Sequence, residues 1–433
     1  MKVYKFGGAS VKDAAGIKNL AHIVRQEHKQ GLLVVVSAMG KTTNALEALL
    51  SLKNLNEERQ TSINKILDFH VQICGELFPE NHIIFEEIET IIKHIEQSLA
   101  KSDWPSYDFL YDQVVSQGEI LSTKIVAYYL KEIKLAAHWI HAKKLIFTNN
   151  TYRAAKVDLK KTNAAITTFF KNKSDIFVTQ GFIGNCPENF TTTLGREGSD
   201  YSAALFAASI AQESVSIWKD VDGVYNADPK YFSNAKLIPY LSYEEAKELT
   251  FFGASIIHPK TIKPLEEKNI KLIVRSFYKP SLMGSIVGNN DSQNKRITSI
   301  IVKQNQLLLS LSPHDYGFMG SENIALVIQL LNKHQHAINL MQNSARSFSV
   351  CVDKNQHNFE ALKMELQSSF KLRYNKEQVL ISIRNYHNHM SEKIYQNIDF
   401  KLEQRNRTTF QIIVNQEEFY EKVIPTLNQL LDQ

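Results

Sequence analysis

Apolar and polar residues alternate in two ways along the first two-thirds of the chain. The run GLLVVVSAMG, residues 31–40, is apolar almost throughout, which is typical of a strand buried on both faces. Residues 43–52 follow with apolar side chains at helical spacing. Apolar runs at 134–148, 174–184 and 214–219 predict further strands. This alternation predicts an α/β domain with a largely parallel central sheet, whose ligands bind beyond the carboxyl ends of the strands.

Residues 54–101 depart from this alternation. They are rich in Glu, Lys and Ile, with apolar positions at helical spacing. We therefore expect a helical excursion from the sheet between its first strands.

The last third of the chain contains a repeat. After Gly288 the polar stretch NNDSQNKR reads as a linker, and beyond it QLLLSLS (306–312) recurs as QVLISIR (378–384). SFSVCVD (347–353) likewise recurs as TFQIIVN (409–415), with helical stretches between and after each pair. The pattern predicts a strand–helix–strand–strand–helix unit that occurs twice, with a shorter second copy. The alternative is one irregular α+β domain that contains several amphipathic strands.

Composition narrows the classes of partner. Of 433 residues, 43% are hydrophobic and 22% charged, and 50 basic against 45 acidic residues leave a net charge of +5 with no long basic run. Nucleic acid is therefore not expected as the main partner, whereas a phosphate-bearing substrate is compatible. The N-terminus lacks the pattern of an export signal and no apolar run approaches membrane-spanning length, so we expect no membrane partner. Cys74, Cys186 and Cys351 show no metal or redox spacing, which favours the cytoplasm.

The stretch KFGGAS, from Lys5 to Ser10, has two readings by itself. Gly-Gly pairs form ordinary tight turns, and neither common nucleotide-binding pattern can be written through this one. A lysine beside two exposed amides could equally hold phosphate groups. The choice between turn and phosphate cradle depends on what the fold brings beside it.

Three charged residues in other clusters complement a phosphate cradle. Arg196, in GREGSD, has the forked guanidinium that binds a carboxylate through two hydrogen bonds. Glu119, in SQGEILS, could hold an ammonium group. Asp200 precedes the apolar segment YSAAL, where it could serve the site or simply cap a helix. Together these groups suit the transfer of a phosphoryl group to an amino acid.

Six motifs in order resemble those of the aspartate kinase (aspartokinase) family. They are KFGGASV, SAMGKTTN, SQGEILS, GREGSDYSA, WKDVDGVYNADP and SYEEAKELTFFGASIIHPKTIKP. The resemblance implies an amino-acid-kinase fold over residues 1–290. The C-terminal repeat is similar to the family's paired ACT-type regulatory modules, which implies two ferredoxin-like α+β modules at about 297–370 and 371–433, with strands exchanged between them.

The resemblance also assigns roles to individual residues. It implies a catalytic group of Lys5, Gly8, Ser37 and Asp200. It implies aspartate-binding positions at Thr43, Glu119, Arg196 and Ser199, with Glu119 on the α-ammonium and Arg196 on the α-carboxylate. It implies ATP-binding positions at Lys5, Phe6, Gly7, Gly8, Lys219, Asp220, Tyr225, Lys230, Ser255 and Ile256. It implies an effector site for lysine or threonine that includes Met319, Gly320, Ser321, Glu322, Ser344 and Ala345.

The activity so implied is ATP-dependent phosphorylation of the L-aspartate side chain to 4-phospho-L-aspartate. This is the first step of lysine, threonine and methionine synthesis, in a monofunctional enzyme under feedback control. Magnesium would be carried on ATP without protein ligands, and the ACT-type modules would form a homodimer or homotetramer. Three residues depart from the family pattern: Ala9 replaces Thr, Glu197 replaces Gly and Lys219 replaces Thr. We expect the Glu197 side chain to point away from the substrate.

Two other functions are compatible with parts of the sequence. A kinase of the same fold that acts on glutamate, N-acetylglutamate or uridylate would share the phosphate-binding residues. Glu119 argues against the acetylated substrate, which has no free ammonium. A non-catalytic amino-acid sensor would keep the ACT-type modules, but Lys5, Arg196 and Asp200 argue against the loss of activity. The second module is short, so the two modules could also serve only as a dimer scaffold.

Overall fold

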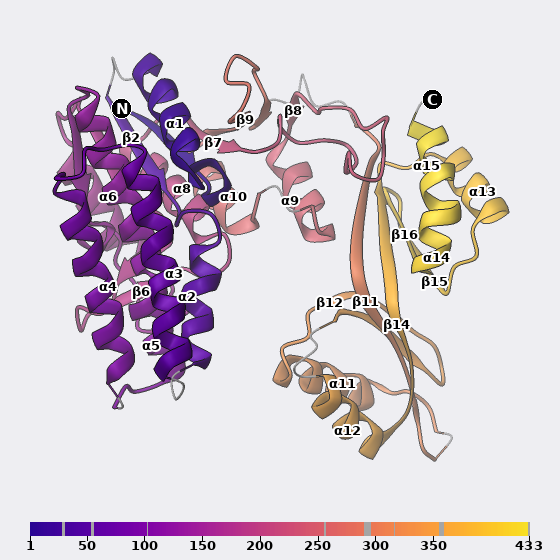
Figure 1. Ribbon diagram of the computed structural model, residues 1–433. Helices are drawn as coiled ribbons and strands as arrows, with labels where there is room; N and C mark the ends of the chain where they lie inside the picture. The colour runs from indigo at the N-terminus through magenta and orange to yellow at the C-terminus, as the bar shows by residue number, and fades with distance from the viewer. Residues whose placement is uncertain are drawn as a thin grey trace. The chain divides into compact units, whose positions relative to one another are not determined.

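A computed structural model describes eight stretches of the chain: 1–27, 31–52, 56–101, 103–254, 257–289, 296–315, 317–354 and 359–431 (Figure 1). It divides into two compact units. The first comprises Met1–Val224, Pro239–Lys247 and Ile256–Asn294. The second comprises Tyr225–Ile238, Glu248–Ser255 and Lys295–Gln433. The chain thus contributes two short internal segments to the C-terminal unit before it leaves the N-terminal one.

The first unit is built on an eight-stranded sheet in the order β3-β4-β2-β1-β7-β9-β10-β8. All pairs from β3 to β9 are parallel, and only the β9–β10 pair is antiparallel. The strands are β1 (Lys2–Phe6), β2 (Leu32–Val36), β3 (Ala137–Ile140), β4 (Ile176–Gln180), β7 (Ser214–Lys219), β8 (Tyr240–Leu241), β9 (Lys271–Ser276) and β10 (Ser285–Val287). A separate hairpin consists of β5 (Ile183–Asn185) and β6 (Thr191–Thr193). The predicted α/β class with a largely parallel sheet is confirmed.

Helices connect these strands. They are α1 (Ala14–Glu27), α2 (Thr42–Ser51), α3 (Asn56–Gly75), α4 (Ile84–Ala100), α5 (Tyr107–Val115), α6 (Gln117–Glu132), α7 (Leu159–Phe170), α8 (Gly198–Ile210), α9 (Tyr243–Phe252) and α10 (Pro259–Glu266). Two 3₁₀ turns are η1 (Gly8–Val11) and η3 (Ala142–Lys144). The residues of α9 are divided between the two units. The predicted helical excursion is confirmed as α3 and α4.

The burial of the strands follows their composition. Every residue of β2 is buried, as a continuous apolar run predicts for a strand covered on both faces. The predicted strand at 134–148 is shorter than expected, because β3 ends at Ile140. His141 then accepts a hydrogen bond from the backbone of Lys143 at 3.3 Å, which caps η3 and turns the chain away from the sheet.

The second unit contains a six-stranded antiparallel sheet in the order β12-β13-β11-β14-β16-β15. Its strands are β11 (Ser299–Pro313), β12 (Ile338–Asn343), β13 (Phe348–Asp353), β14 (Phe370–Arg384), β15 (Leu402–Arg405) and β16 (Thr409–Asn415). Its helices are α11 (Ser321–Lys333), α12 (Phe359–Ser369), α13 (Asn388–Asn397), α14 (Gln416–Glu418) and α15 (Ile424–Leu431), with a π-helical turn, η5 (Phe419–Val423), before the last. The predicted repeat is confirmed, and the alternative of one irregular domain is not.

Strands β11 and β14 each serve both copies of the repeat. They are 15 residues long and pair with each other, with a shift in register between Lys303 and Gln306. Before the shift, β11 joins a core with β16, α13 and α15, which includes Ile300, Ile381 and Ile412. After it, β11 joins a separate core with β13, α11 and α12. The two central strands of the sheet therefore each continue from one module into the other.

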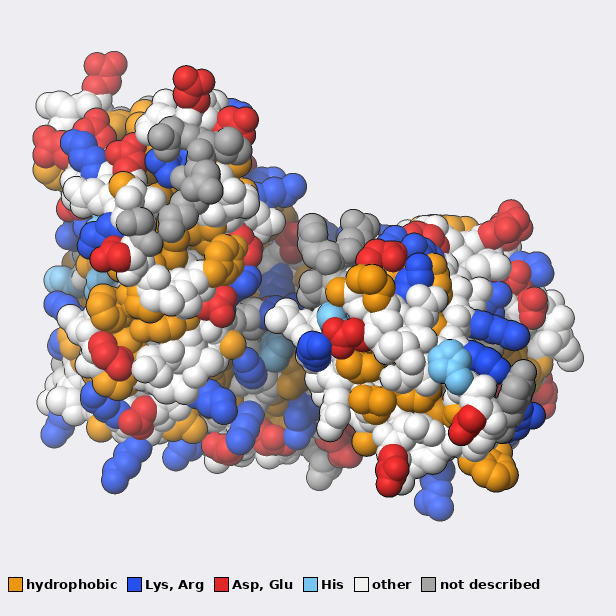
Figure 2. Space-filling model, turned by 90° about the horizontal axis from the view of Figure 1, so that it is seen from below, with side chains coloured by type: hydrophobic (Ala, Val, Ile, Leu, Met, Phe, Trp, Pro, Cys, Tyr) orange, Lys and Arg blue, Asp and Glu red, His pale blue; other side chains and the backbone are white. Residues whose placement is uncertain are grey.

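Surface charge and cysteines agree with the composition. Basic and acidic side chains are interspersed on the face shown in Figure 2. All three cysteines are buried and unpaired. In the part of the chain that the structure describes, no helix has the length and apolar character needed to cross a membrane.

Candidate active site

Four parallel strands of the first unit deliver polar side chains to one edge of the sheet. Strands β4, β2, β1 and β7 are successive neighbours, so their carboxyl ends lie side by side. Lys5 lies near the end of β1, Ser37 follows β2, and Lys219 ends β7. Residues far apart in the sequence thus meet at the edge where a parallel sheet binds ligands.

The glycine turn after β1 packs against the turn after β2. The Gly40 N–H donates to the Gly8 carbonyl at 3.0 Å. A Cβ atom on Gly8 would lie 2.6 Å from the Ala38 carbonyl oxygen, so no larger residue fits there. The side chain of Phe6, which we expected to contact nucleotide, packs in the core parallel to Trp218 at 5.9 Å. The two turns form one backbone surface beside Lys5.

Two lysines flank one buried carboxylate at this edge. The Lys5 Nζ lies 2.6 Å from Asp200 Oδ1, and the Lys219 Nζ lies 3.4 Å from Asp200 Oδ2. Burial alone would raise the pKa of Asp200, but the two ammonium groups outweigh it and hold this pKa below its usual range. The cluster therefore carries one net positive charge, fixed in a largely buried place.

Asp200 does not cap its helix. Helix α8 begins at Gly198 with Glu197 at the N-cap, and Asp200 lies in the first turn. Its carboxylate is directed to the lysines, so the alternative of a plain capping residue does not describe this structure. The position still suits an acid, because the first turn of a helix favours negative charge.

Glu119 is a buried acid, and none of the residues that the structure describes places a cation in hydrogen-bond range of it. Its side chain lies at the start of α6, where Oε1 accepts from the Ala38 N–H at 3.4 Å. Oε2 is buried and has no hydrogen-bond partner among the described residues. Burial raises the pKa of Glu119 to about 8, although the nearby charge of Lys5 acts in the other direction. Such a group gains most from a ligand that brings a positive charge.

Arg196 reaches the same space from the loop after β6. It is exposed and lies between Gly195, at φ +76°, and Glu197, at φ +53°. A Cβ atom on Gly195 would lie 3.1 Å from the Arg153 carbonyl oxygen. Arg196 is thus exposed in a left-handed turn, and α8 begins two residues later at Gly198.

These groups line one cavity of about 600 Å³. It contains the predicted residues Lys5, Ser37, Thr43, Glu119, Arg196, Ser199, Asp200 and Lys219. It also contains Asn44 and Gly195, which lie in two of the motifs but had no role assigned, and four residues outside every motif: Glu47, Tyr111, Arg153 and Phe182. A fixed cation, an acid suited to an ammonium group and the exposed guanidinium of Arg196 therefore share one space.

Glu197 is among the residues that line this cavity, at a left-handed backbone position. Its Oε2 is buried without a hydrogen-bond partner among the described residues. That its side chain points away from the substrate stays a prediction.

The other predicted nucleotide residues are not brought into this cavity. Asp220 is exposed just after β7. Tyr225 and Lys230 belong to the second unit. Ser255 and Ile256 lie outside the described residues. Their roles remain predictions.

Asp112, which sequence reasoning missed, holds the backbone that leads to Arg196. Its buried carboxylate accepts from Thr193 Oγ1 at 2.6 Å, from the Thr193 N–H at 2.9 Å and from the Arg153 N–H at 3.1 Å. Arg153 in turn contacts Glu47 at 2.9 Å and Asp108 at 3.6 Å. Asp112 is thus a positioning residue for the strand and loop that present Arg196.

We expect Asp112→Asn to raise the KM for the acceptor about tenfold, the effect of one impaired buried hydrogen bond. Burial raises the pKa of Asp112 to about 6. Below pH 6 its carboxylate becomes protonated and accepts hydrogen bonds less well, so kcat/KM should fall. Because the folded pKa lies above the unfolded one, the stability from this group is lost as pH rises through 6, not as it falls. Protonation of Asp112 does not unfold the protein, so unfolding through this group would not explain the fall of kcat/KM below pH 6. A pH profile of kcat/KM checks this, and an inflection near pH 6 that persists in Asp112→Asn would contradict it.

The predicted effector residues lie in two neighbouring turns of the second unit. The Met319 N–H donates to the Ala345 carbonyl at 2.9 Å. Gly320 is the N-cap of α11, with Ser321 and Glu322 exposed in its first turn. Ser344 closes the turn between β12 and β13 through hydrogen bonds to Ser347. A cavity of about 220 Å³ nearby is lined by other residues, among them Ser347, Arg346 and Lys371.

The chain is similar in sequence to a known protein family and to several known enzymes. The amino acid kinase family matches residues 1–276. Lysine-sensitive aspartokinase 3 of Escherichia coli is 33% identical over 355 residues, which are 81% of this chain and 78% of that protein. Aspartokinase 1 of Arabidopsis thaliana is 31% identical over 81% of this chain and 63% of that protein. A bifunctional aspartokinase/homoserine dehydrogenase of the same plant is 30% identical, and the match spans 35% of its length.

Solved structures agree over the whole chain. Escherichia coli aspartokinase III in complex with aspartate and ADP has a TM-score of 0.84 at 27% identity and covers 100% of both chains. The same enzyme in complex with lysine and aspartate has a TM-score of 0.84 at 28% identity, with 100% of this chain and 99% of that one covered.

Proposed function

Since the chain belongs to the amino acid kinase family and, within it, to the aspartokinases, we infer that it transfers the γ-phosphoryl group of ATP to the side-chain carboxylate of L-aspartate. The product is 4-phospho-L-aspartate, in the first step of the synthesis of aspartate-family amino acids. The observation that carries this function is the single cavity that joins the Lys5–Asp200–Lys219 cluster to Glu119 and Arg196.

We assign the acceptor end of the cavity to Glu119 and Arg196. Glu119 pairs with the α-ammonium, and the guanidinium of Arg196 binds the α-carboxylate through two parallel hydrogen bonds. Thr43 and Ser199 line the same cavity and contribute hydroxyl groups. This leaves the side-chain carboxylate directed toward Lys5.

The phosphoryl end needs charge neutralisation and in-line positioning. The acceptor carboxylate has an ordinary pKa of about 3.9, so it is ionised at neutral pH and no general base is required. Lys5 stabilises the transferring group, Asp200 orients Lys5, and the amides of the Gly7–Gly8 turn with Ser37 hold phosphate oxygens. Lys219 adds a second cation, and magnesium would enter on ATP and neutralise the remaining phosphate charge. Asp220, Tyr225, Lys230, Ser255 and Ile256 are proposed for the rest of the nucleotide.

Hydroxylamine trapping tests the function. The purified chain with ATP and magnesium should form acyl phosphate with aspartate, and far less with glutamate or N-acetylglutamate. A preference for N-acetylglutamate would reassign the chain to another kinase of the fold. No product with any acceptor, from a protein that still binds ATP, would favour the amino-acid sensor.

We expect the affinity for aspartate to rise with pH between 6 and 8, by at most about tenfold per pH unit. Glu119 is largely protonated in the free protein at pH 7, because its pKa is about 8, and the ammonium of aspartate binds the ionised form. Binding at pH 7 should therefore release a proton. Calorimetry in two buffers with different ionisation enthalpies measures that proton. Glu119→Gln should bind weakly and without it, and proton uptake by the unaltered chain would contradict the assignment.

We propose that the second unit regulates the enzyme by binding lysine. The amides at the start of α11 can receive the α-carboxylate, close to the turn of Ser344 and Ala345. The names of the Escherichia coli relatives, which include lysine sensitivity and a lysine complex, support this choice. The modules would also join the chain into a homodimer or homotetramer. The unpaired cysteines support a cytoplasmic location.

Millimolar lysine should raise the melting temperature by a few degrees and lower activity, since a ligand that binds one folded state stabilises it. Ser321→Ala and Glu322→Gln should abolish both effects. Glu360→Gln, which removes an exposed acid from α12 in the same unit, is the matched control. If threonine acts instead of lysine, the effector is reassigned. No response to either leaves the modules as a scaffold.

A further inference from the structure

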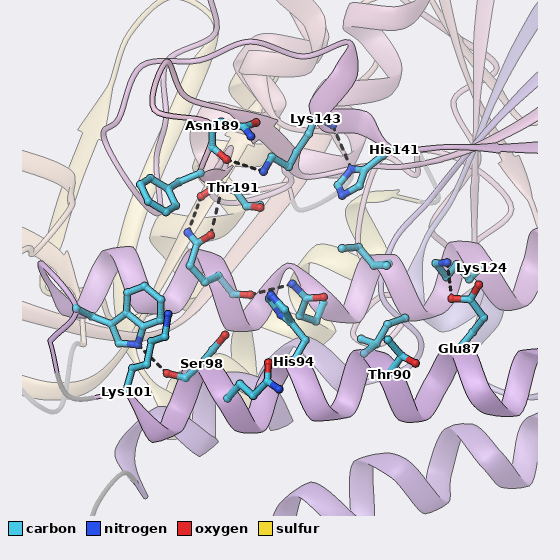
Figure 3. A pocket seen from close by; sticks show the side chains of 17 residues that line it. Glu87, Thr90, His94, Ser98, Lys101, Lys124, His141, Lys143, Asn189 and Thr191 are labelled. Atoms are coloured by element: carbon cyan, nitrogen blue, oxygen red, sulfur yellow. Dashed lines mark hydrogen bonds and ion pairs between the residues drawn. The ribbon is translucent and has the colours of Figure 1, made fainter.

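A second cavity, of about 550 Å³, lies in the first unit and contains none of the residues assigned above. Its walls are α4, α6, η3 and the loop between β5 and β6 (Figure 3). Its volume falls within the usual range for small-molecule sites. We propose that this cavity binds a small organic anion with two separate acidic groups, such as a dicarboxylate.

The charge balance of the walls favours an anion. Lys101, Lys124 and Lys143 line the cavity, and Glu87 is the one acid among its lining residues. Glu87 is already used, because its Oε2 lies 2.6 Å from the Lys124 Nζ. No carboxylate among the described residues lies within 4.0 Å of the Nζ of Lys101 or Lys143. Two positive charges therefore remain for a ligand.

A bound anion would stabilise the charged form of Lys143. Its Nζ donates to the Asn189 carbonyl at 2.9 Å, and burial lowers its pKa. The ammonium is thus partly removed from water, and its hydrogen-bond partner among the described residues is a neutral carbonyl oxygen. A carboxylate at this position would supply the missing negative charge.

Two histidines that line the cavity, His94 and His141, have pKa values lowered partly by the nearby lysines. Burial, followed by the charges of Lys101 and Lys143, lowers the pKa of His94. Burial, followed by the charges of Lys143, Lys144 and Lys124, lowers the pKa of His141 to about 4. Both rings are therefore neutral at pH 7. Lys101 and Lys143 both lie near enough to lower the pKa of His94, and all three residues line the cavity.

The two lysines stand on different walls, which favours an extended ligand over a compact one. Figure 3 shows Lys143 beside Asn189 on one wall and Lys101 at the end of α4 on the other, with His94 directed between them. Lys101 also lies 4.9 Å from the centre of the Trp104 ring. A ligand with an acidic group at each end could reach both cations, whereas inorganic phosphate has a single centre of charge.

Amide side chains give this cavity a fixed floor. Gln113 is buried and donates to the Thr191 carbonyl at 2.8 Å, while its Oε1 accepts from the Thr191 N–H at 3.3 Å. Gln117 donates to the Gln113 carbonyl at 3.0 Å. The polar floor is therefore shaped before any ligand arrives, which lowers the entropy cost of binding.

Succinate is the probe, because it lacks the ammonium that Glu119 requires. The protein is the full chain with Arg196→Ala, which weakens carboxylate binding in the active site. Calorimetry should show saturable binding of succinate at low ionic strength, and the fluorescence of Trp104 should change with it. Lys101→Ala and Lys143→Ala should each raise the dissociation constant about tenfold or more, the effect of one lost charge contact. Lys93→Ala, an exposed lysine on the same helix α4, is the control and should have no effect.

Three results would overturn the proposal. One is no saturable binding of succinate, malate or citrate. Another is binding that survives both lysine substitutions. The third is phosphate binding of equal affinity and equal lysine dependence, which would make this a single-anion site. Lys101→Ala and Lys143→Ala in the chain with Arg196 intact should keep their kinase activity without added anion, which shows that they fold.

Discussion

Lys5→Ala is expected to lower kcat by about 100-fold or more while the KM for aspartate changes little. Lys5 is the cation nearest to Asp200, at 2.6 Å, and it is almost fully buried beside the Gly7–Gly8 turn. A cation in such a place stabilises charge that develops only during phosphoryl transfer, so its loss appears mainly in kcat. Steady-state kinetics with both substrates varied measures the effect.

Lys2→Ala is the matched control for that experiment. Lys2 lies on the same strand β1, is half-exposed and pairs with Glu27 on the surface. Its substitution should leave kcat unchanged and cost little stability. A Lys5→Ala variant with near-normal kcat would contradict the phosphate cradle and restore the reading of KFGGAS as a turn.

Arg196→Lys should raise the KM for aspartate about tenfold or more, although the charge is kept. A lysine cannot form the two parallel hydrogen bonds that a guanidinium offers to a carboxylate. The KM for ATP should barely change, because the groups proposed for the phosphates come from β1, β2 and β7 and not from this loop. If ATP affinity falls and aspartate affinity does not, Arg196 belongs to the nucleotide.

Arg153→Lys provides the comparison within the same cavity. Arg153 already pairs with Glu47 and lies 4.3 Å from the centre of the Tyr111 ring. Its guanidinium is therefore engaged by the protein, and its substitution should raise the KM for aspartate less than Arg196→Lys does. An equal or larger effect would transfer the α-carboxylate to Arg153.

Much of the fold was predictable because the apolar patterns are local. The run at 31–40 contains the fully buried strand β2 (Leu32–Val36), and both copies of the C-terminal repeat formed their strands and helices. The strand predicted at 134–148 is shorter than expected, because β3 ends at Ile140 and the His141 side chain caps a turn within the apolar segment. Such a cap depends on one hydrogen bond and does not change the spacing of apolar residues from which the strand was predicted.

The site was predictable where a motif carries its own chemistry. Lys5, Glu119, Arg196 and Asp200 each stand in a short recognisable stretch, and the sheet brings them to one cavity. Asp112 lies in no such stretch, since its meaning comes from contacts with Thr193 and Arg153 across the fold. The left-handed backbone of Glu197 was not predicted either, because a non-glycine residue rarely adopts it.

The long strands β11 and β14 have a consequence for how the chain is made. The first part of β11 shares a core with β16 and α15, which the ribosome delivers more than a hundred residues later. The part of β11 that follows shares its core with α11, α12 and the start of β14, which emerge sooner. The core around the first part of β11 can therefore form only after β16 and α15 have been synthesised. By then the later part of β11 can already be packed in the neighbouring module. Strands that are neighbours in the sheet are thus far apart in the order of synthesis. If the two copies were expressed separately, the first would lack β14 and the second would lack β11, so neither would have a complete sheet.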